Sequence, residues 1–385
     1  MKFDVVILGA GPAGLAAARA ACRTGASVAL IDDNPAAGGQ IWRGSALIDI
    51  PPSARFLSQT RVFDVRAGFI LETDLHGAIA GSRLILATGA RELFLPFPGW
   101  TEPGVFGAGG LQALVKSGLS VRGKRVVVAG SGPLLVAVAA ALRKQGARVV
   151  GIAEQAPLGR ILRFLRRYPA KLPQAIGLRA RLVGVPYWTG TWPVRFAAGR
   201  RVTLSNGKIL AVDYLACGFG LVPNTEAAQL LGCRLDDGFV AVDSRQETTI
   251  KGVYCVGEPT GIGGLDKALE EGERAGSAAT GQAVRRRTRT GAFVRDLAAA
   301  FDLDPRLFDL AEPGTVVCRC EDVSYETLQP YREWREAKLQ TRCGMGPCQG
   351  RICGPITGCL FGWTAGSVRV PLVPVRADVL VRGGR

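Results

Sequence analysis

The sequence has a single histidine and lacks any long hydrophobic run. His76 is that one histidine among 385 residues, so a hydrolytic site built on Ser-His or Cys-His is nearly excluded. Its Leu-His-Gly setting is typical of a solvated turn. No stretch reaches the roughly 18 apolar residues of a membrane-spanning helix. The apolar residues after Asp4 predict a strand rather than a signal peptide, so we expect a cytoplasmic protein.

Glycine, apolar and basic residues are abundant. The 51 glycines and the 48% of hydrophobic residues suit a globular protein of two or three domains with many tight turns. Most of the basic residues behind the formal net charge of +16 are arginine, a bias that often reflects genome composition. The alternative is a basic surface that favours an acidic partner subunit or peripheral contact with an anionic membrane face. The densest basic run, Arg285 to Arg289, continues a helical stretch. No nucleic-acid module accompanies it, so we interpret it as a solvated helix face.

The N-terminal segment predicts a dinucleotide-binding βαβ unit. A strand over residues 3–8 precedes a G-x-G-x-x-G turn and an Ala-rich helix, and a second strand over residues 27–31 ends at an acid. In such a unit the first glycine makes the tight turn, the second lets the backbone approach pyrophosphate, and the third lets helix and strand pack closely. The helix N-terminus faces the phosphates. The candidate nucleotide-binding residues are Gly9, Gly11, Pro12, Ala13, Gly14, Asp32 and Asp33.

Three further motifs resemble the FAD signatures of two-dinucleotide-domain flavoproteins. They are Gly38-Gly39-Gln40, Ala87-Thr88-Gly89, and Gly257-Glu258 with Gly264 shortly after it. The resemblance implies FAD in the first site, bound also by Gly39, Gln40, Ala87, Thr88, Gly89, Gly257, Glu258 and Gly264. The superfamily usually has aspartate at position 258, where the acid accepts a hydrogen bond from the flavin ribityl chain. Few residues separate Gln40 from the next expected strand, 61–66, so we expect thin cover on the adenosine side.

The glycine motif recurs in the middle of the chain, at Gly130-Ser131-Gly132. A strand precedes it, an Ala-rich helix follows, and the next strand ends at Glu154. This internal repeat predicts an inserted second dinucleotide-type domain. Leu135 stands where a third glycine or alanine belongs, so NAD(P) binding at Gly130, Gly132 and Glu154 is disfavoured. The insertion has no C-x-x-C pair, which argues against thioredoxin-reductase chemistry.

Six of the ten cysteines lie between Val316 and Cys359. Thiolates crowded into loops with glycine and proline can bind an iron-sulfur cluster. The alternatives are structural zinc, which favours C-x2-4-C spacing, disulfides, which are rare in the cytoplasm, and inert buried thiols. The two motifs, Cys318-Arg-Cys320 and Cys343-Gly-Met-Gly-Pro-Cys348-Gln-Gly-Arg-Ile-Cys353, resemble the [2Fe-2S] module of bacterioferritin-associated ferredoxin type. That resemblance implies Cys318, Cys320, Cys348 and Cys353 as ligands, with Cys343 as the alternate.

Nearly the whole sequence resembles the α (or A) flavoprotein component of bacterial dye-linked amine and amino-acid dehydrogenases, of the opine oxidase, hydrogen cyanide synthase and proline or D-hydroxyproline dehydrogenase kinds. This implies electron transfer from a substrate-oxidising β flavoprotein subunit to a quinone or dye. Some relatives also have a small ferredoxin-like γ subunit, or an FMN at a subunit interface. No catalytic base or nucleophile can be named from the residues. The alternatives are a self-contained NAD(P)H-dependent FAD reductase and a non-catalytic nucleotide-binding scaffold.

We therefore expect an α/β flavoprotein with two dinucleotide-binding domains and a small α-rich C-terminal module. The expected boundaries are 1–100 and 236–281 for the split FAD domain, 101–235 for the inserted NAD-type domain, 282–312 for a helical linker, 313–365 for the [2Fe-2S] module and 366–385 for a tail.

Overall fold

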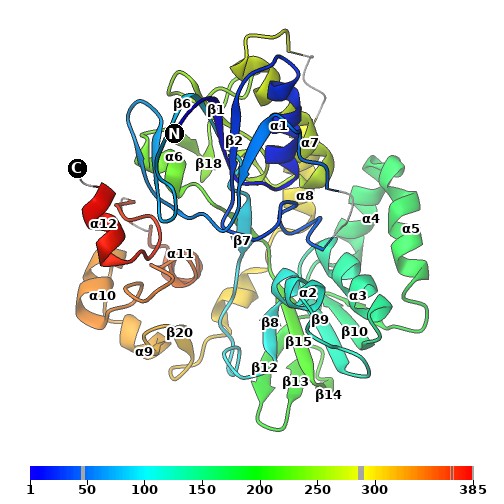
Figure 1. Cartoon of the computed structure of the whole chain (residues 1–385). Coiled ribbons are helices and arrows are strands. Elements are labelled where there is room, and N and C mark those ends of the chain that lie inside the picture. Colours follow the sequence, from blue (N-terminus) through cyan, green and yellow to red (C-terminus); the bar gives the residue numbers. More distant parts are fainter. Residues whose placement is uncertain (45–47, 285–289, 365, 367, 384–385) are drawn as a thin grey trace. The chain divides into compact units, whose positions relative to one another are not determined.

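The computed structural model describes residues 1–44, 48–284, 290–364, 366 and 368–383. The basic run Arg285 to Arg289 lies outside these residues. By their internal contacts the residues form two compact units, coloured along the sequence in Figure 1. The first comprises 1–91, 223–294 and 367–385, and the second comprises 92–222 and 295–366. The five-part division expected from the sequence stays a prediction.

The first unit is built on a mixed sheet in the order β3-β2-β1-β6-β5-β4, with β19 also paired to β6. The long strand β6 pairs in parallel with β1 and β19 and, through its first residues, antiparallel with β5. The edge strand β3 was not expected, because two prolines precede it and it is only four residues long. The sheet strands are β1 (Lys2–Leu8), β2 (Val28–Ile31), β3 (Ala54–Leu57), β4 (Val62–Arg66), β5 (Ile70–Thr73), β6 (Gly77–Leu86) and β19 (Val253–Cys255).

Two helices of this unit, α1 (Pro12–Cys22) and α7 (Gly264–Ala279), pack with their backbones in contact. A Cβ atom on Gly272 would lie 2.2 Å from the Ala13 carbonyl oxygen, and one on Gly276 would lie 2.2 Å from that of Ala17. Glycine is therefore required at both positions for this approach. Smaller elements are β7 (Ala90–Glu92), β16 (Leu221–Pro223), α6 (Glu226–Leu230), β17 (Leu235–Asp236), β18 (Phe239–Val240), η2 (Glu258–Thr260) and α12 (Ala377–Gly383).

The second unit contains a five-stranded parallel sheet in the order β11-β10-β9-β15-β8 and an antiparallel sheet, β12-β13-β14. Helix α8 (Thr290–Ala300) leads back into it from the first unit. The strands are β8 (Val105–Gly107), β9 (Arg125–Gly130), β10 (Arg148–Glu154), β11 (Tyr187–Thr189), β12 (Pro193–Ala197), β13 (Arg201–Leu204), β14 (Ile209–Ala211), β15 (Tyr214–Gly218), β20 (Val316–Cys318) and β21 (Val323–Ser324). The helices are α2 (Ala108–Lys116), α3 (Leu134–Lys144), α4 (Leu158–Arg167), η1 (Pro169–Lys171), α5 (Leu172–Ala180), η3 (Pro305–Asp309), α9 (Tyr325–Leu328), α10 (Trp334–Thr341) and α11 (Cys353–Phe361).

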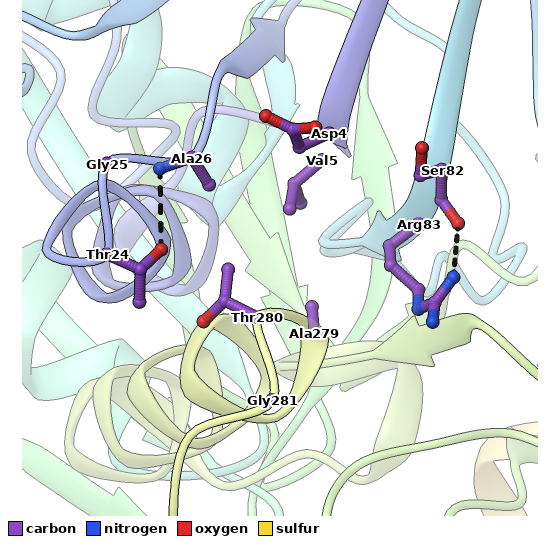
Figure 2. A pocket seen from close by; sticks show the side chains of 10 residues that line it. All are labelled: Asp4, Val5, Thr24, Gly25, Ala26, Ser82, Arg83, Ala279, Thr280 and Gly281. Atoms are coloured by element: carbon purple, nitrogen blue, oxygen red, sulfur yellow. Dashed lines mark hydrogen bonds between the residues drawn. The ribbon is translucent and has the colours of Figure 1, made fainter.

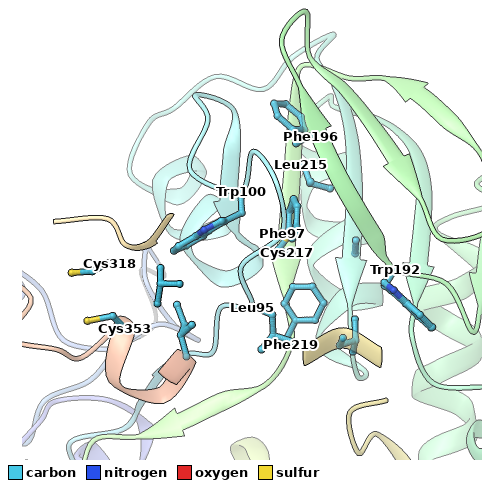
Figure 3. Close-up of a cluster of buried hydrophobic side chains, with 14 of the residues drawn as sticks. Leu95, Phe97, Trp100, Trp192, Phe196, Leu215, Cys217, Phe219, Cys318 and Cys353 are labelled. Atoms are coloured by element: carbon cyan, nitrogen blue, oxygen red, sulfur yellow. The ribbon is translucent and has the colours of Figure 1, made fainter. Parts of the chain in front are cut away.

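One hydrophobic core runs through the second unit and includes cysteines of the C-terminal region (Figure 3). Trp100, which is 3% exposed, donates its indole N–H to the Val316 carbonyl at 2.6 Å. Cys318 and Cys353 belong to the same core. The inserted domain and the cysteine region are thus joined by shared packing. Within the described part of the chain, none of the helices is long and apolar enough to cross a membrane.

We expect Gly276→Ala to lower the free energy of unfolding by about 1–3 kcal/mol, because the new methyl group would overlap the backbone of α1. Gly159→Ala is the matched control: it also lies in a helix, but nothing described lies within 4 Å of its added methyl group. It should be neutral or stabilise by up to about 1 kcal/mol. Urea unfolding followed by circular dichroism measures both, and equal effects would contradict close packing of α1 and α7.

Candidate functional site

The first glycine turn lies at the carboxyl end of β1. A Cβ atom on Gly14 would lie 1.9 Å from the Gly9 carbonyl oxygen, so helix and strand meet closely. Gly11 precedes α1, and among the described residues no side chain caps this helix. Among the described residues, a Cβ atom on Gly11 would meet just the Cα atom of Gly39, at 3.9 Å. The N–H groups of α1 can therefore receive a pyrophosphate, which fits a dinucleotide.

Asp32 supports this turn. It is 8% exposed, and its carboxylate accepts from the backbone N–H of Ala10 at 2.6 Å and of Asn34 at 2.9 Å. Arg43 donates to the Asn34 side chain at 2.9 Å, while its buried Nε atom has no hydrogen-bond partner among the described residues. A free donor here suits an adenine nucleotide. Sequence reasoning did not single out Arg43, because a lone arginine in a loop carries no motif. The neighbouring candidate, Asp33, is exposed.

The other FAD-type segments come together at the carboxyl ends of the same strands. Thr88 donates its hydroxyl to the Asn224 carbonyl at 2.6 Å, and the Asn224 amide donates to the Thr88 carbonyl at 2.9 Å. A Cβ atom on Gly257 would lie 3.2 Å from that of Ala13. The segments that carry Ala13 and Gly257 are far apart in sequence and thus lie side by side in the structure. Sequence reasoning also missed Asn224, whose partners lie across a long insertion.

A buried ion pair holds the Gly257 loop. Lys267 and Glu271, whose side chains are 6% and 4% exposed, approach to 2.8 Å within α7. Lys267 also donates to the Gly257 carbonyl at 2.8 Å, and Glu271 accepts from the Gly257 N–H at 3.0 Å. These added bonds compensate for the burial of both charges. Glu258 accepts from the N–H groups of Gly263 and Gly264, so both of its oxygens bind their own loop.

The second glycine turn is covered by the chain itself. A Cβ atom on Gly132 would lie 4.0 Å from the Phe301 ring, which therefore lies where pyrophosphate must approach. The Phe301 carbonyl accepts from the Ser131 hydroxyl at 2.8 Å, and Gln155 donates to the Asp302 carbonyl at 3.1 Å. The segment after α8 thus fills the phosphate position of this domain.

Glu154 is also committed to internal contacts. It is fully buried, and its carboxylate accepts from the N–H groups of Gly132 and Ala156, each at 2.9 Å. Burial raises its pKa from 4.5 to about 7, against the lowering effect of these two bonds. Leu135 is buried too, with a methyl group 3.6 Å from the position of a Cβ atom on Gly218.

The five candidate cysteine ligands lie in one region. Cys318 ends β20, Cys343 follows α10, and Cys353 begins α11; their sulfur atoms all lie within 4.8 Å of one another. These three are buried. The side chain of Cys348 interacts with those of Cys353 and Cys320. The structure therefore brings the alternate, Cys343, next to two of the expected ligands, and the choice of four among five stays a prediction.

The thiols strongly perturb one another. Hydrogen bonds from Cys343 and Cys353 lower the pKa of Cys318 to about 2, with smaller contributions from the backbone N–H groups of Gly344 and Glu321. The side-chain hydrogen bond with Cys318 raises the pKa of Cys343 to about 12. Such crowded sulfur atoms, with backbone donors around them, fit a metal or iron-sulfur centre, which takes thiolate ligands.

The two halves of the cysteine region are tied together. Arg342 donates to Glu321 at 2.8 Å, which joins the residue just before Cys343 to the Cys318-x-Cys320 loop. A Cβ atom on Gly346 would lie 2.3 Å from that of Cys320, so this glycine lets the second loop approach the first. Cys320 itself is exposed. One edge of the cysteine group therefore faces solvent.

A surface hollow of about 630 Å³ in the first unit lies away from the first glycine turn (Figure 2). It is lined by Asp4 and Val5 of β1, Ser82 and Arg83 of β6, and the residues just after α1 and α7. These strand residues lie away from the carboxyl ends of β1 and β6, where dinucleotides bind in such sheets. We assign it no role in cofactor binding.

The family model described as pyridine nucleotide-disulphide oxidoreductase matches residues 3–275. The chain belongs to this family. It is an FAD-binding oxidoreductase family, and the chain has its α/β fold of two dinucleotide-binding domains, followed by a cysteine-rich C-terminal region. The expected fold class is confirmed.

Relatives in this family match over most of the chain. The A component of opine oxidase from Rhizobium meliloti (strain 1021) is 32% identical, covering 91% of this chain and 90% of the relative. Hydrogen cyanide synthase subunit HcnB of Pseudomonas aeruginosa is 31% identical, covering 92% and 91%. The crystal structure of L-proline dehydrogenase from P. horikoshii has a TM-score of 0.70 over 99% of this chain and 79% of that chain, at 19% identity. The expected resemblance to flavoprotein components of this kind is confirmed.

Glu154 should make stability fall as the pH rises. Its pKa in the folded chain, about 7, lies above the ordinary value of 4.5, so its contribution is full below pH 4.5 and is lost as the pH passes through 7. The loss amounts to about 3 kcal/mol. Glu154→Gln should flatten the pH dependence of the unfolding midpoint between pH 5 and pH 8, measured by circular dichroism. If the unfolding midpoint of Glu154→Gln changes between pH 5 and pH 8 as much as that of the unaltered protein, the internal role of this carboxyl group is refuted.

Serine substitutions distinguish the cluster ligands. We expect Cys318→Ser, Cys320→Ser, Cys348→Ser and Cys353→Ser each to lose most bound iron and visible absorption, because each removes one of the four predicted thiolate ligands. Cys343→Ser should keep the centre. Cys359→Ser is the control, since this half-buried thiol of α11 lies outside the group. If Cys343→Ser loses the iron while Cys353→Ser retains it, the ligand set is wrong.

Proposed function

We propose that the protein is a flavin and iron-sulfur electron-transfer subunit of a multi-subunit amine or amino-acid dehydrogenase, of the opine, proline or hydroxyproline type. It passes electrons from a substrate-oxidising β flavoprotein subunit to an acceptor such as a quinone. The names of its relatives support this, because they are subunits of opine oxidase and hydrogen cyanide synthase. An FMN held between subunits and a small ferredoxin-like γ subunit complete the proposed complex, which works in the cytoplasm.

The first glycine turn is the proposed FAD site. The N–H groups at the start of α1 bind the pyrophosphate, and Arg43 offers its free Nε donor to the adenosine half. Lys267 and Glu271 hold Gly257 in place beside Ala13. Bound FAD supplies two-electron chemistry, and the residues here bind and orient it.

The cysteine group is the proposed [2Fe-2S] site. Cys318, Cys320, Cys348 and Cys353 supply the four thiolates that such a cluster requires. The backbone N–H groups that point at the Cys318 sulfur would tune the reduction potential of the cluster. The exposed edge at Cys320 lets a partner approach closely.

The observation that carries the proposal is the contrast between the two glycine turns. The turn at Gly11 faces the backbone of another glycine, Gly39, whereas the turn at Gly132 faces the Phe301 ring. The Ser131 hydroxyl donates to the Phe301 carbonyl, and Gln155 donates to the Asp302 carbonyl, so the segment after α8 is bonded over the second turn. This disfavours a self-contained NAD(P)H-dependent reductase, which needs a second working dinucleotide site. The electrons must then come from a source other than NAD(P)H, and a partner subunit would supply them. A non-catalytic scaffold would not require a group of cysteines whose thiols shift one another's pKa values.

Anaerobic stopped-flow mixing of the purified holoprotein with NADPH tests this function. We expect no bleaching of the flavin absorption above the buffer control, because Phe301 covers the second nucleotide site. Co-purified complex with the β subunit should reduce a dye when given the amine or amino-acid substrate. Rapid bleaching by NADPH alone would establish the reductase instead, and a chain that stays colourless after anaerobic reconstitution would establish the scaffold.

A further inference from the structure

One long part of the second unit carries positive charge without any acid. Residues 155–212 contain no aspartate or glutamate, yet they include basic side chains throughout. Within this stretch α4 and α5 lie at one side of the unit, with α5 against α3 (Figure 1). Arg163, Arg166 and Arg181 are exposed there. Arg160 and Arg167, by contrast, bind Asp302 and Asp296 of the same unit.

Helix α4 also exposes apolar side chains. Leu158 and Leu162, one turn apart, are 53% and 44% exposed. Phe164 is the residue of α4 that is buried, and it lies on another side of the helix from these leucines. The outward side of α4 therefore mixes leucine with arginine, which is the pattern of a helix that lies at a membrane interface.

Helix α5 continues the same surface. None of its residues is buried, although leucine, isoleucine and alanine make up more than half of it. Ile176 is 65% exposed, and Val183, in the turn that follows, is 71% exposed. Arg179 fixes this turn by donating to the carbonyls of Leu182 and Val185 at 2.7 and 2.9 Å. Val183 is thus presented to solvent by a hydrogen-bonded turn rather than by a loose one.

We propose that this α4–α5 surface, comprising residues 158–183, docks on an anionic lipid bilayer. The aliphatic side chains enter the outer part of the bilayer, and the arginines contact lipid phosphates. Protein interfaces are enriched in exposed aromatic residues as well as in arginine. The aromatic side chains here, Phe164 and Tyr168, are instead buried or bonded within the unit. Because residues 155–212 contain no acid, they also fit a partner of uniformly negative charge, such as a membrane, better than a protein surface of mixed charge. This inference does not depend on the proposed function.

Sedimentation of the full-length protein with lipid vesicles tests the proposal. Vesicles of phosphatidylcholine with one part in four of phosphatidylglycerol should bind it, and pure phosphatidylcholine should not. The triple variant Arg163→Gln, Arg166→Gln, Arg181→Gln should lower the partition coefficient by on the order of a hundredfold, since each arginine contributes about fivefold near an anionic surface. Ile176→Gln with Val183→Gln should lower it by about tenfold through lost apolar insertion.

The matched control is Arg201→Gln with Ile209→Gln. These residues lie in β13 and β14 of the same unit, and Ile209 is 63% exposed, like Ile176. This pair should bind vesicles as the unaltered protein does. All of these positions are exposed, and unfolding midpoints confirm that each variant folds. Equal binding to both vesicle types, or equal losses in the control, would overturn the proposal. If the complex with the β subunit no longer binds anionic vesicles while the isolated chain does, the surface is a protein interface, so the proposal fails.

Discussion

The contact between the backbones of α1 and α7 is the constraint on which the first unit depends. Two helices from opposite ends of the FAD-type sequence approach so closely only because Gly272 and Gly276 face Ala13 and Ala17. The contact brings Gly257 beside the start of α1, so that two sequence signatures form one site. The Lys267–Glu271 pair then fixes the loop from within α7. A larger side chain at the helix contact would displace both signatures from each other.

The chain contains two versions of one turn, and they have different roles. In both, an acid at the end of the second strand accepts a backbone N–H from the glycine loop: Asp32 from Ala10, and Glu154 from Gly132. In the helix of the first turn Gly14 packs against the Gly9 carbonyl, whereas the helix of the second turn has the buried Leu135 at the matching position. The architecture of the repeat is therefore retained where its ligand site has been filled by Phe301.

Local patterns predicted the two βαβ units, the solvated His76 turn and the grouping of the C-terminal cysteines, since each depends on residues close in sequence. Leu135 alone led to the prediction of a weak second nucleotide site, which stays a prediction. The contact of Phe301 with this turn could not be foreseen, because Phe301 reaches Ser131 across 170 residues. Strand β3 was missed since four residues carry little periodicity. Asn224, Arg43 and the Lys267–Glu271 pair gain their meaning only from three-dimensional neighbours, and no spacing rule identifies them.

The core shared by the inserted domain and the cysteine region bears on how such a chain can be rearranged. Trp100, from the start of the insertion, is bonded to the strand that delivers Cys318. Removing the segment that carries the cysteines would expose apolar surface on the insertion, and the same segment moved to another protein would lose the apolar side chains that the insertion packs against it. The cysteine segment is therefore not an independent folding unit. It can be gained, lost or exchanged only together with the domain on which it is folded.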